Sequence, residues 1–91
     1  MPDEPLLREH ARKVVRHGLV PARRPDRVWG GYGHDGAPCM ICAQRIGSVD
    51  HEFILEFMPA GGGVDRFYVH PRCYAAWEFE RTKMNGRNLS P

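Results

Sequence analysis

The chain has 91 residues, 42% hydrophobic and 26% charged, a composition typical of a globular rather than a disordered protein. This length supports one small core and excludes two, so we expect a single domain over residues 1–91. The net charge of +2 is small for a protein dedicated to nucleic acid, and no apolar run approaches the roughly 20 residues of a membrane-spanning helix.

The cysteine content and the first residues of the chain bear on its compartment. Three Cys is an odd number, which disfavours a closed disulfide framework and favours a reducing environment. Residues 1–9 lack the apolar run of a signal peptide. We therefore expect a cytoplasmic protein.

An amphipathic helix is predicted over residues 4–18. Pro5 suits the first turn of this helix, and Gly18 can end it. The apolar side chains follow the helical period and are expected to face the core: Leu7, Ala11, Val14 and Val15.

Residues 19–38 predict an extended linker. Three prolines and four glycines in this stretch disfavour long regular structure. Trp29 is one of its two large rings, and we expect it to anchor the linker to the core.

A β-hairpin and a second helix are predicted in the remainder of the chain. Residues 51–58 are rich in aromatic and branched side chains, and residues 66–70 predict a returning strand after a glycine-rich turn. The second helix is expected to start near Pro71 and to run to about Met84, where Asn85–Gly86 supplies a stop signal.

Two short motifs carry the chemistry. A C-x2-C pair is followed, after a spacer of 27 residues, by an H-x2-C pair. Zinc takes four tetrahedral ligands in structural sites, and Cys3His is one of its standard ligand sets. We expect one structural Zn²⁺ with iron as the alternative metal at a thiolate-rich site. The expected ligands are Cys39, Cys42, His70 and Cys73.

The cysteines and histidines of this chain also allow roles other than a structural metal site. A redox C-x2-C pair normally lies in a βαβ context, which the predicted elements do not supply. Haem attachment is excluded because Ala43 stands where that motif requires His. Buried free thiols are a further alternative, and so is His51 in place of His70 as the fourth ligand.

The predicted order of knuckle, hairpin and helix is the treble-clef arrangement. We therefore predict an α+β fold in which residues 39–85 form a small zinc-stabilised treble clef and residues 4–18 add an N-terminal helix. The candidate core residues are Leu7, Val14, Trp29, Ile46, Phe53, Leu55, Phe67, Tyr74 and Trp77.

Two resemblances concern these motifs. Residues 39–77 resemble the zinc finger of poly(ADP-ribose) polymerases, which implies a finger of this ligand order; the DNA-contacting elements of that family have no matching residues here. The segments RRPDRVWGGYG, CMIC and VHPRCYAAWEFER, which cover most of residues 23–81, resemble a family of small uncharacterised bacterial proteins. That resemblance implies a self-contained zinc domain.

A third resemblance is to the HNH endonucleases, in which a histidine activates water beside a divalent metal. It rests on the C-x2-C pair followed by Val49-Asp50-His51-Glu52 and a Gly-Gly loop. The chain departs from that family because no paired His precedes His51 and no Asn or final His follows at the usual places.

The expected function is that of a structural zinc domain acting as a protein-interaction or adaptor module, a monomer or weak homodimer whose protein partner is not identified. Phe79 is a candidate contact point. No enzyme activity is expected, because the chain has no Ser/His/Asp set at a recognisable spacing and no phosphate-binding glycine loop with its Lys.

Nucleic-acid binding is the alternative function. Residues 8–27 carry seven basic and two acidic side chains, a local excess that can contact phosphates. The candidate contacts are Arg8, Arg12, Arg16, Arg23, Arg24 and Arg27.

Overall fold

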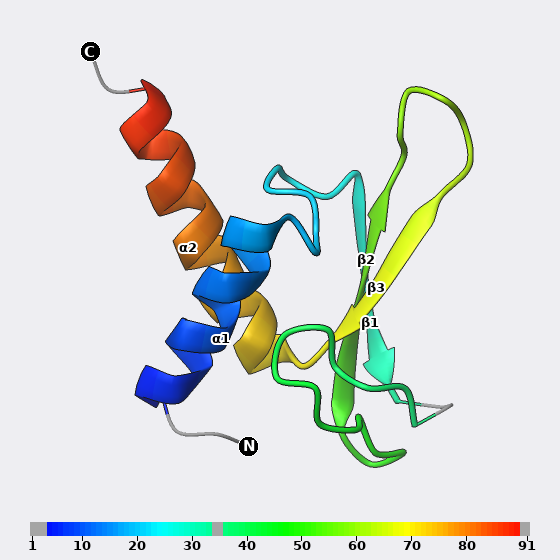
Figure 1. Ribbon diagram of the computed structural model, residues 1–91. Helices are drawn as coiled ribbons and strands as arrows, with labels where there is room; N and C mark the ends of the chain where they lie inside the picture. The colour runs from blue at the N-terminus through cyan, green and yellow to red at the C-terminus, as the bar shows by residue number, and fades with distance from the viewer. Residues whose placement is uncertain (1–3, 34–35, 90–91) are drawn as a thin grey trace.

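The computed structural model describes residues 4–33 and 36–89 and shows two helices and a three-stranded antiparallel sheet (Figure 1). The helices are α1 (Glu4–His17) and α2 (Pro71–Leu89), and the strands are β1 (Arg27–Tyr32), β2 (His51–Phe57) and β3 (Asp65–Val69). An α+β architecture is confirmed at this level.

Helix α1 forms where the apolar period predicts it. Leu7, Ala11, Val14 and Val15 are all buried. The helix ends at Gly18, whose φ of 65° lies in the left-handed region that glycine adopts without strain. The N–H groups of Gly18 and Leu19 return to the carbonyls of Val15 and Val14 at 3.2 and 3.1 Å, which caps the helix.

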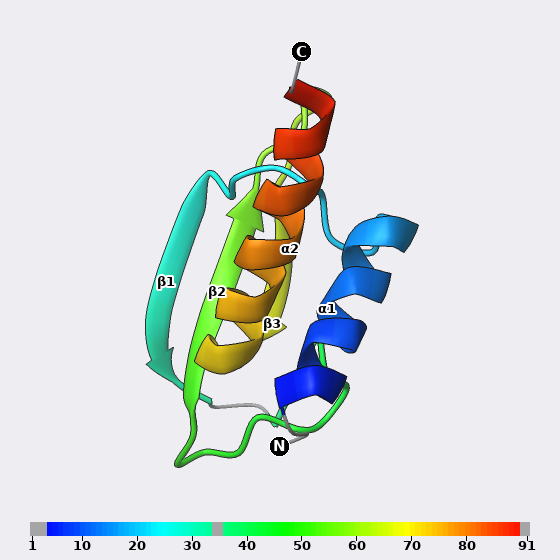
Figure 2. The ribbon, with the colours of Figure 1, turned by 90° about the vertical axis from the view of Figure 1, so that its left-hand side faces the viewer.

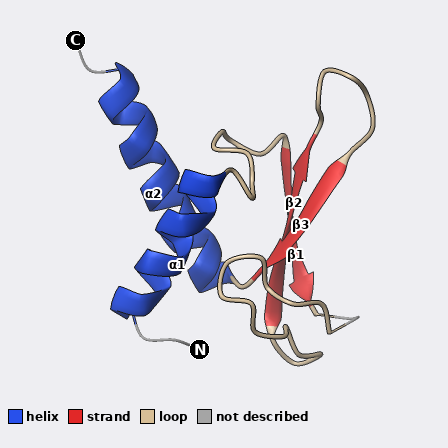
Figure 3. Ribbon diagram, viewed as in Figure 1, coloured by secondary structure: helices blue, strands red, loops and turns tan. Residues whose placement is uncertain are grey.

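The sheet has the strand order β1-β2-β3, with both neighbouring pairs antiparallel. The predicted hairpin is confirmed as β2 and β3, in which Leu55 lies opposite Phe67. Both helices lie on one face of this sheet: α2 packs on β2, and α1 packs on α2 (Figures 1 and 2). No helix of the described ranges covers the opposite face (Figure 3).

The core lies between α2 and the sheet and extends to α1. Phe57 and Trp77 meet edge to face with ring centroids 6.3 Å apart, and both rings are fully buried. Of the expected core residues, Leu7, Val14, Ile46, Leu55 and Trp77 are buried. Phe53, Phe67 and Tyr74 are partly buried and pack against this cluster.

The linker contains a strand that was not predicted, and one expectation about it is wrong. Residues 27–32 form strand β1, which pairs with β2, whereas the prediction for residues 19–38 was an extended linker without an assigned strand. Trp29 does not anchor the core, because its side chain is 51% exposed. Pairing with a neighbouring strand supplies hydrogen bonds that local propensity does not anticipate.

The end of α2 also differs from the prediction. The helix starts at Pro71 as expected but continues through Asn85–Gly86 to Leu89. Asn and Gly lower helix propensity, Gly by about 1 kcal/mol relative to Ala, but unlike Pro they keep the backbone N–H that the helix needs. In the described part of the chain, no helix is long and apolar enough to cross a membrane.

Candidate metal centre

A tight turn between β1 and β2 presents the first two cysteines. Pro38 and Arg45 form an isolated antiparallel bridge at its base, and Cys39 donates its N–H to the carbonyl of Gln44 at 2.8 Å. Ala43 donates back to the carbonyl of Cys39 at 2.9 Å and has a φ of 66°. This left-handed residue reverses the chain so that both thiol groups lie inside the turn.

The other two candidate ligands lie where β3 passes into α2. His70 follows the last residue of β3, and Pro71 opens the helix, a position that needs no backbone N–H. Tyr74 donates its N–H to the carbonyl of His70 at 2.9 Å, which begins the helical hydrogen bonds. Cys73, in the first turn, therefore lies at the same end of the helix as His70.

The four ligand atoms converge in one buried group. One ligand atom each from Cys39, Cys42, His70 and Cys73 lies within 4.8 Å of the other three. His70 directs Nδ1 toward the sulfurs of Cys42 at 3.5 Å and Cys73 at 3.8 Å. A tetrahedral ion with bonds of about 2.3 Å to sulfur and about 2.0 Å to nitrogen separates its ligands by roughly 3.5–3.8 Å. The group can therefore hold a single metal ion.

Backbone N–H groups prepare the site for negative charge. Ile41 and His70 direct their N–H groups to the sulfur of Cys39 at 3.4 and 3.5 Å. With a hydrogen bond from the Cys73 thiol as the largest cause, these contacts lower the pKa of Cys39. The same thiol–thiolate hydrogen bond raises the pKa of Cys73, and burial raises that of Cys42. A bound cation would displace the protons of these two thiols, because metals bind the thiolate form.

The alternative ligand His51 lies outside this group. His51 is exposed at the start of β2, and its ring stacks on Tyr32 with centroids 4.9 Å apart. Within the described ranges, the four-residue Cys/His cluster is the one group of potential metal ligands, and it does not include His51.

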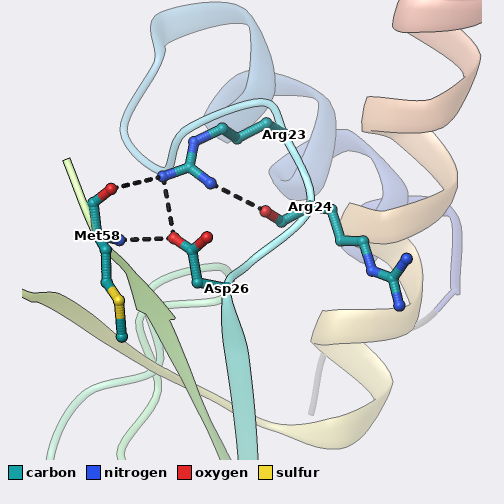
Figure 4. A network of polar contacts seen from close by, with 4 residues as sticks. All are labelled: Arg23, Arg24, Asp26 and Met58. Carbon is teal, nitrogen blue, oxygen red and sulfur yellow. Dashed lines mark hydrogen bonds and ion pairs between the residues drawn. The ribbon is translucent and has the colours of Figure 1, made fainter. Parts of the chain in front are cut away.

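Three of the six arginines proposed for nucleic acid contact other side chains of the protein. Arg12 pairs with the buried carboxylate of Glu80 at 3.3 Å, and Arg8 lies over the ring of Phe79 at 5.6 Å. Arg23 binds Asp26 at 3.2 Å and approaches the carbonyl of Met58 at 3.5 Å (Figure 4).

All six arginines of this set are exposed. Arg16 lies near the end of α1. Arg24 extends away from the Arg23–Asp26 network (Figure 4), and it borders a cleft of about 580 Å³ that Arg27 and Arg81 also line.

Sequence reasoning missed two contributors to this region. Met40 donates its N–H to the carbonyl of Tyr68 at 2.9 Å, which docks the cysteine turn on β3. Strand β1 was missed as well, although Val28, Trp29 and Tyr32 are residue types enriched in strands. The type and spacing of residues could have indicated the strand, whereas the backbone contact of Met40 leaves no signal in the sequence.

In comparisons with known protein families, curated proteins and solved structures, no match to the chain was found. The buried Cys3His group is compatible with a zinc finger.

Proposed function

We propose that the chain is a zinc-stabilised protein-interaction module in which residues 39–85 form a treble clef. The observation that carries the metal assignment is the buried convergence of three thiols and one imidazole. Zinc accepts this mixed sulfur and nitrogen set in tetrahedral geometry. Four protein ligands leave no position for a substrate water, so the proposed role of the metal is structural.

The need for a metal follows from the size of the core. A small domain buries a smaller fraction of its surface than a large one, and a structural metal is a common supplement to a small core. The centre would join the cysteine turn, the end of β3 and the start of α2 at one point. Removal of the ion would release all three elements.

The interaction role is supported by exposed apolar side chains on β1. Trp29 and Tyr32 are 51% and 64% exposed, and aromatic side chains of this kind are enriched in protein interfaces. Phe79, the contact point expected from sequence, is also exposed, but Arg8 and Lys83 lie over its ring at 5.6 and 6.0 Å. The aromatic side chains of β1 are favoured over Phe79 because they lie on an edge strand of the sheet, where a partner can also bind the backbone.

The experiment combines metal analysis with surface substitution. The chain would be purified without added metal, assayed for zinc and used to capture proteins by cross-linking. Trp29→Ala should keep the zinc but lose a specific captured protein. Val49→Ala, which also shortens an exposed apolar side chain but lies in a loop, should lose neither. Equal capture by the unmodified chain and both variants would contradict the role of β1.

Nucleic-acid binding is a second candidate, supported by Arg24 and Arg27 at the cleft. The cleft is lined by more basic than acidic side chains, and its Asp26 is already bound to Arg23. Arg24→Ala/Arg27→Ala should weaken binding to a short DNA or RNA and reduce its salt dependence. Arg12 is unsuitable for this test because its replacement would remove an ion pair from the buried Glu80 carboxylate and so lower stability.

A further inference from the structure

Strand β1 is an open edge of the sheet. Figure 2 shows β1 along one border, with no described helix or strand beyond it. Every residue of β1 is exposed. Natural proteins usually protect such an edge with Pro, Lys or an inward-pointing charge. Between Val28 and Tyr32 the sequence VWGGY contains none of these.

The hydrogen-bonding direction of each β1 residue follows from the pairing with β2. Gly33 donates its N–H to the carbonyl of Asp50 at 3.0 Å, in line with the β1–β2 register. Residues that bond to a given neighbour alternate along an antiparallel strand. Val28, Gly30 and Tyr32 therefore direct their N–H and C=O groups away from β2, where another strand can bind them.

The sequence of β1 is complementary to itself in one antiparallel register. If Gly30 of one copy faces Gly30 of a second copy, Val28 faces Tyr32 and Trp29 faces Gly31. All outward backbone groups then meet their counterparts, which gives roughly six backbone hydrogen bonds. Trp29 lies opposite a residue without a side chain, and an added Cβ at Gly31 has no neighbour within 4 Å. The bulky indole therefore meets open space.

The register brings no like charges together. Arg27 would face Gly33 of the second copy, a residue without a charge, and within its own copy Arg27 lies opposite Glu56. The charge on each edge strand therefore does not oppose the pairing.

We propose that two copies of the chain associate through antiparallel pairing of their β1 strands, centred on Gly30, to form one continuous six-stranded sheet. This inference deepens the proposed interaction role and rests on it. A two-fold axis normal to the sheet through Gly30 places the helices of both copies on the same face. The opposite face, which carries Trp29, becomes twice as large.

Paired substitutions test the register. Val28→Lys/Tyr32→Lys places like charges opposite each other across the pairing, whereas Val28→Lys/Tyr32→Glu places opposite charges there. Both positions are exposed in the single chain, at 43% and 64%, so folding should survive. Val64→Lys, an apolar-to-Lys change at an exposed loop residue, is the matched control. Circular dichroism and zinc content verify that each variant is folded.

Light scattering and sedimentation measure the average molar mass of each protein from micromolar to millimolar concentration. For the unmodified chain and for Val64→Lys, this mass should rise with concentration from 10.4 kDa toward twice that value. Val28→Lys/Tyr32→Lys should remain at 10.4 kDa, and Val28→Lys/Tyr32→Glu should associate again. A monomeric unmodified chain, an associating Lys/Lys variant or a monomeric Lys/Glu variant overturns the pairing. A folded monomer with zinc leaves the proposed metal role standing, whereas a metal-free chain overturns that role separately.

Discussion

Met40 donates its backbone N–H to the carbonyl of Tyr68 at 2.9 Å, which joins the cysteine turn to the strand that leads into His70. Tyr68 lies two residues before His70, and Met40 lies between Cys39 and Cys42. One backbone hydrogen bond therefore aligns the two halves of the ligand set. This contact and the proposed metal would therefore act on the same two segments.

Replacing one ligand should remove the metal and the fold of the C-terminal half. Structural zinc contributes about 10–16 kcal/mol of apparent binding energy, comparable to the roughly 5–15 kcal/mol total stability of a typical domain. Cys73→Ser should therefore bind no zinc and lose its cooperative thermal transition. Ala75→Ser, at an exposed position of the same helix, is the control and should retain both. A folded, metal-free Cys73→Ser chain would refute the structural role.

Gly33 is required where the loop after β1 passes close to residues 46 and 47. A Cβ at Gly33 would lie 2.6 Å from the carbonyl oxygen of Gly47 and 2.9 Å from Ile46. Because backbone must move to relieve this clash, Gly33→Ala should lower the free energy of unfolding by about 1–3 kcal/mol. Gly61→Ala, where an added Cβ meets nothing within 4 Å, should change it little. Denaturant titration of both variants checks the difference, and equal stability would contradict this packing.

Ala43 holds a left-handed backbone conformation in the cysteine turn, with a φ of 66°. This conformation costs a residue with a Cβ about 1–2 kcal/mol. Glycine avoids that cost, but it loses more backbone entropy on folding, which offsets part of the gain. Ala43→Gly should therefore stabilise the zinc-bound chain by roughly 0.5–1 kcal/mol. Ala60→Gly, in a loop without positive φ at that residue, should not stabilise. A loss of stability in Ala43→Gly would contradict the turn geometry.

Local sequence signals predicted the parts of the structure that depend on neighbouring residues. These signals extend over only a few neighbouring residues. They are the apolar period of α1, the glycine at its end, the hairpin pattern and the proline at the start of α2. The two ligand pairs are local motifs too, and only the distance between the pairs is set by tertiary structure. This explains why Cys39, Cys42, His70 and Cys73 could be grouped from spacing alone.

The parts that sequence reasoning missed depend on contacts between distant segments. Strand β1 contains Gly30 and Gly31, which lower strand propensity, yet it pairs with β2 along its whole length. The arginines of α1 looked like a free basic stripe, but Arg12 is bound by Glu80, 68 residues away in sequence. Neither pairing has a local signature.

The acid sensitivity of the fold should depend on Glu56. Hydrogen bonds from the Trp29 indole and from Arg66, at 2.7 Å, hold the pKa of this carboxyl below its ordinary value of 4.5. The unfolded chain therefore binds the proton more readily. The stability contributed by Glu56 is present above about pH 4.5 and is lost as pH falls through the lower folded-state pKa.

The matched variant Glu56→Gln isolates this effect. Its free energy of unfolding should be lower than that of the unmodified chain at neutral pH, and the difference should shrink as the solution is acidified. Because acid also releases the metal, the two proteins are compared only at pH values at which both are folded and hold zinc. Urea titrations of both proteins from neutral to acid pH supply the data; a difference that is constant or grows in acid would contradict the assignment.

Metal stoichiometry decides whether one ion at the Cys3His group holds the fold together. The mass of the chain would be measured under native and denaturing conditions, with zinc quantified and folding followed during chelation. We expect one zinc per chain, lost together with the folded structure. A chain that is folded without metal, or that keeps its structure after complete chelation, would show that the metal does not hold the fold.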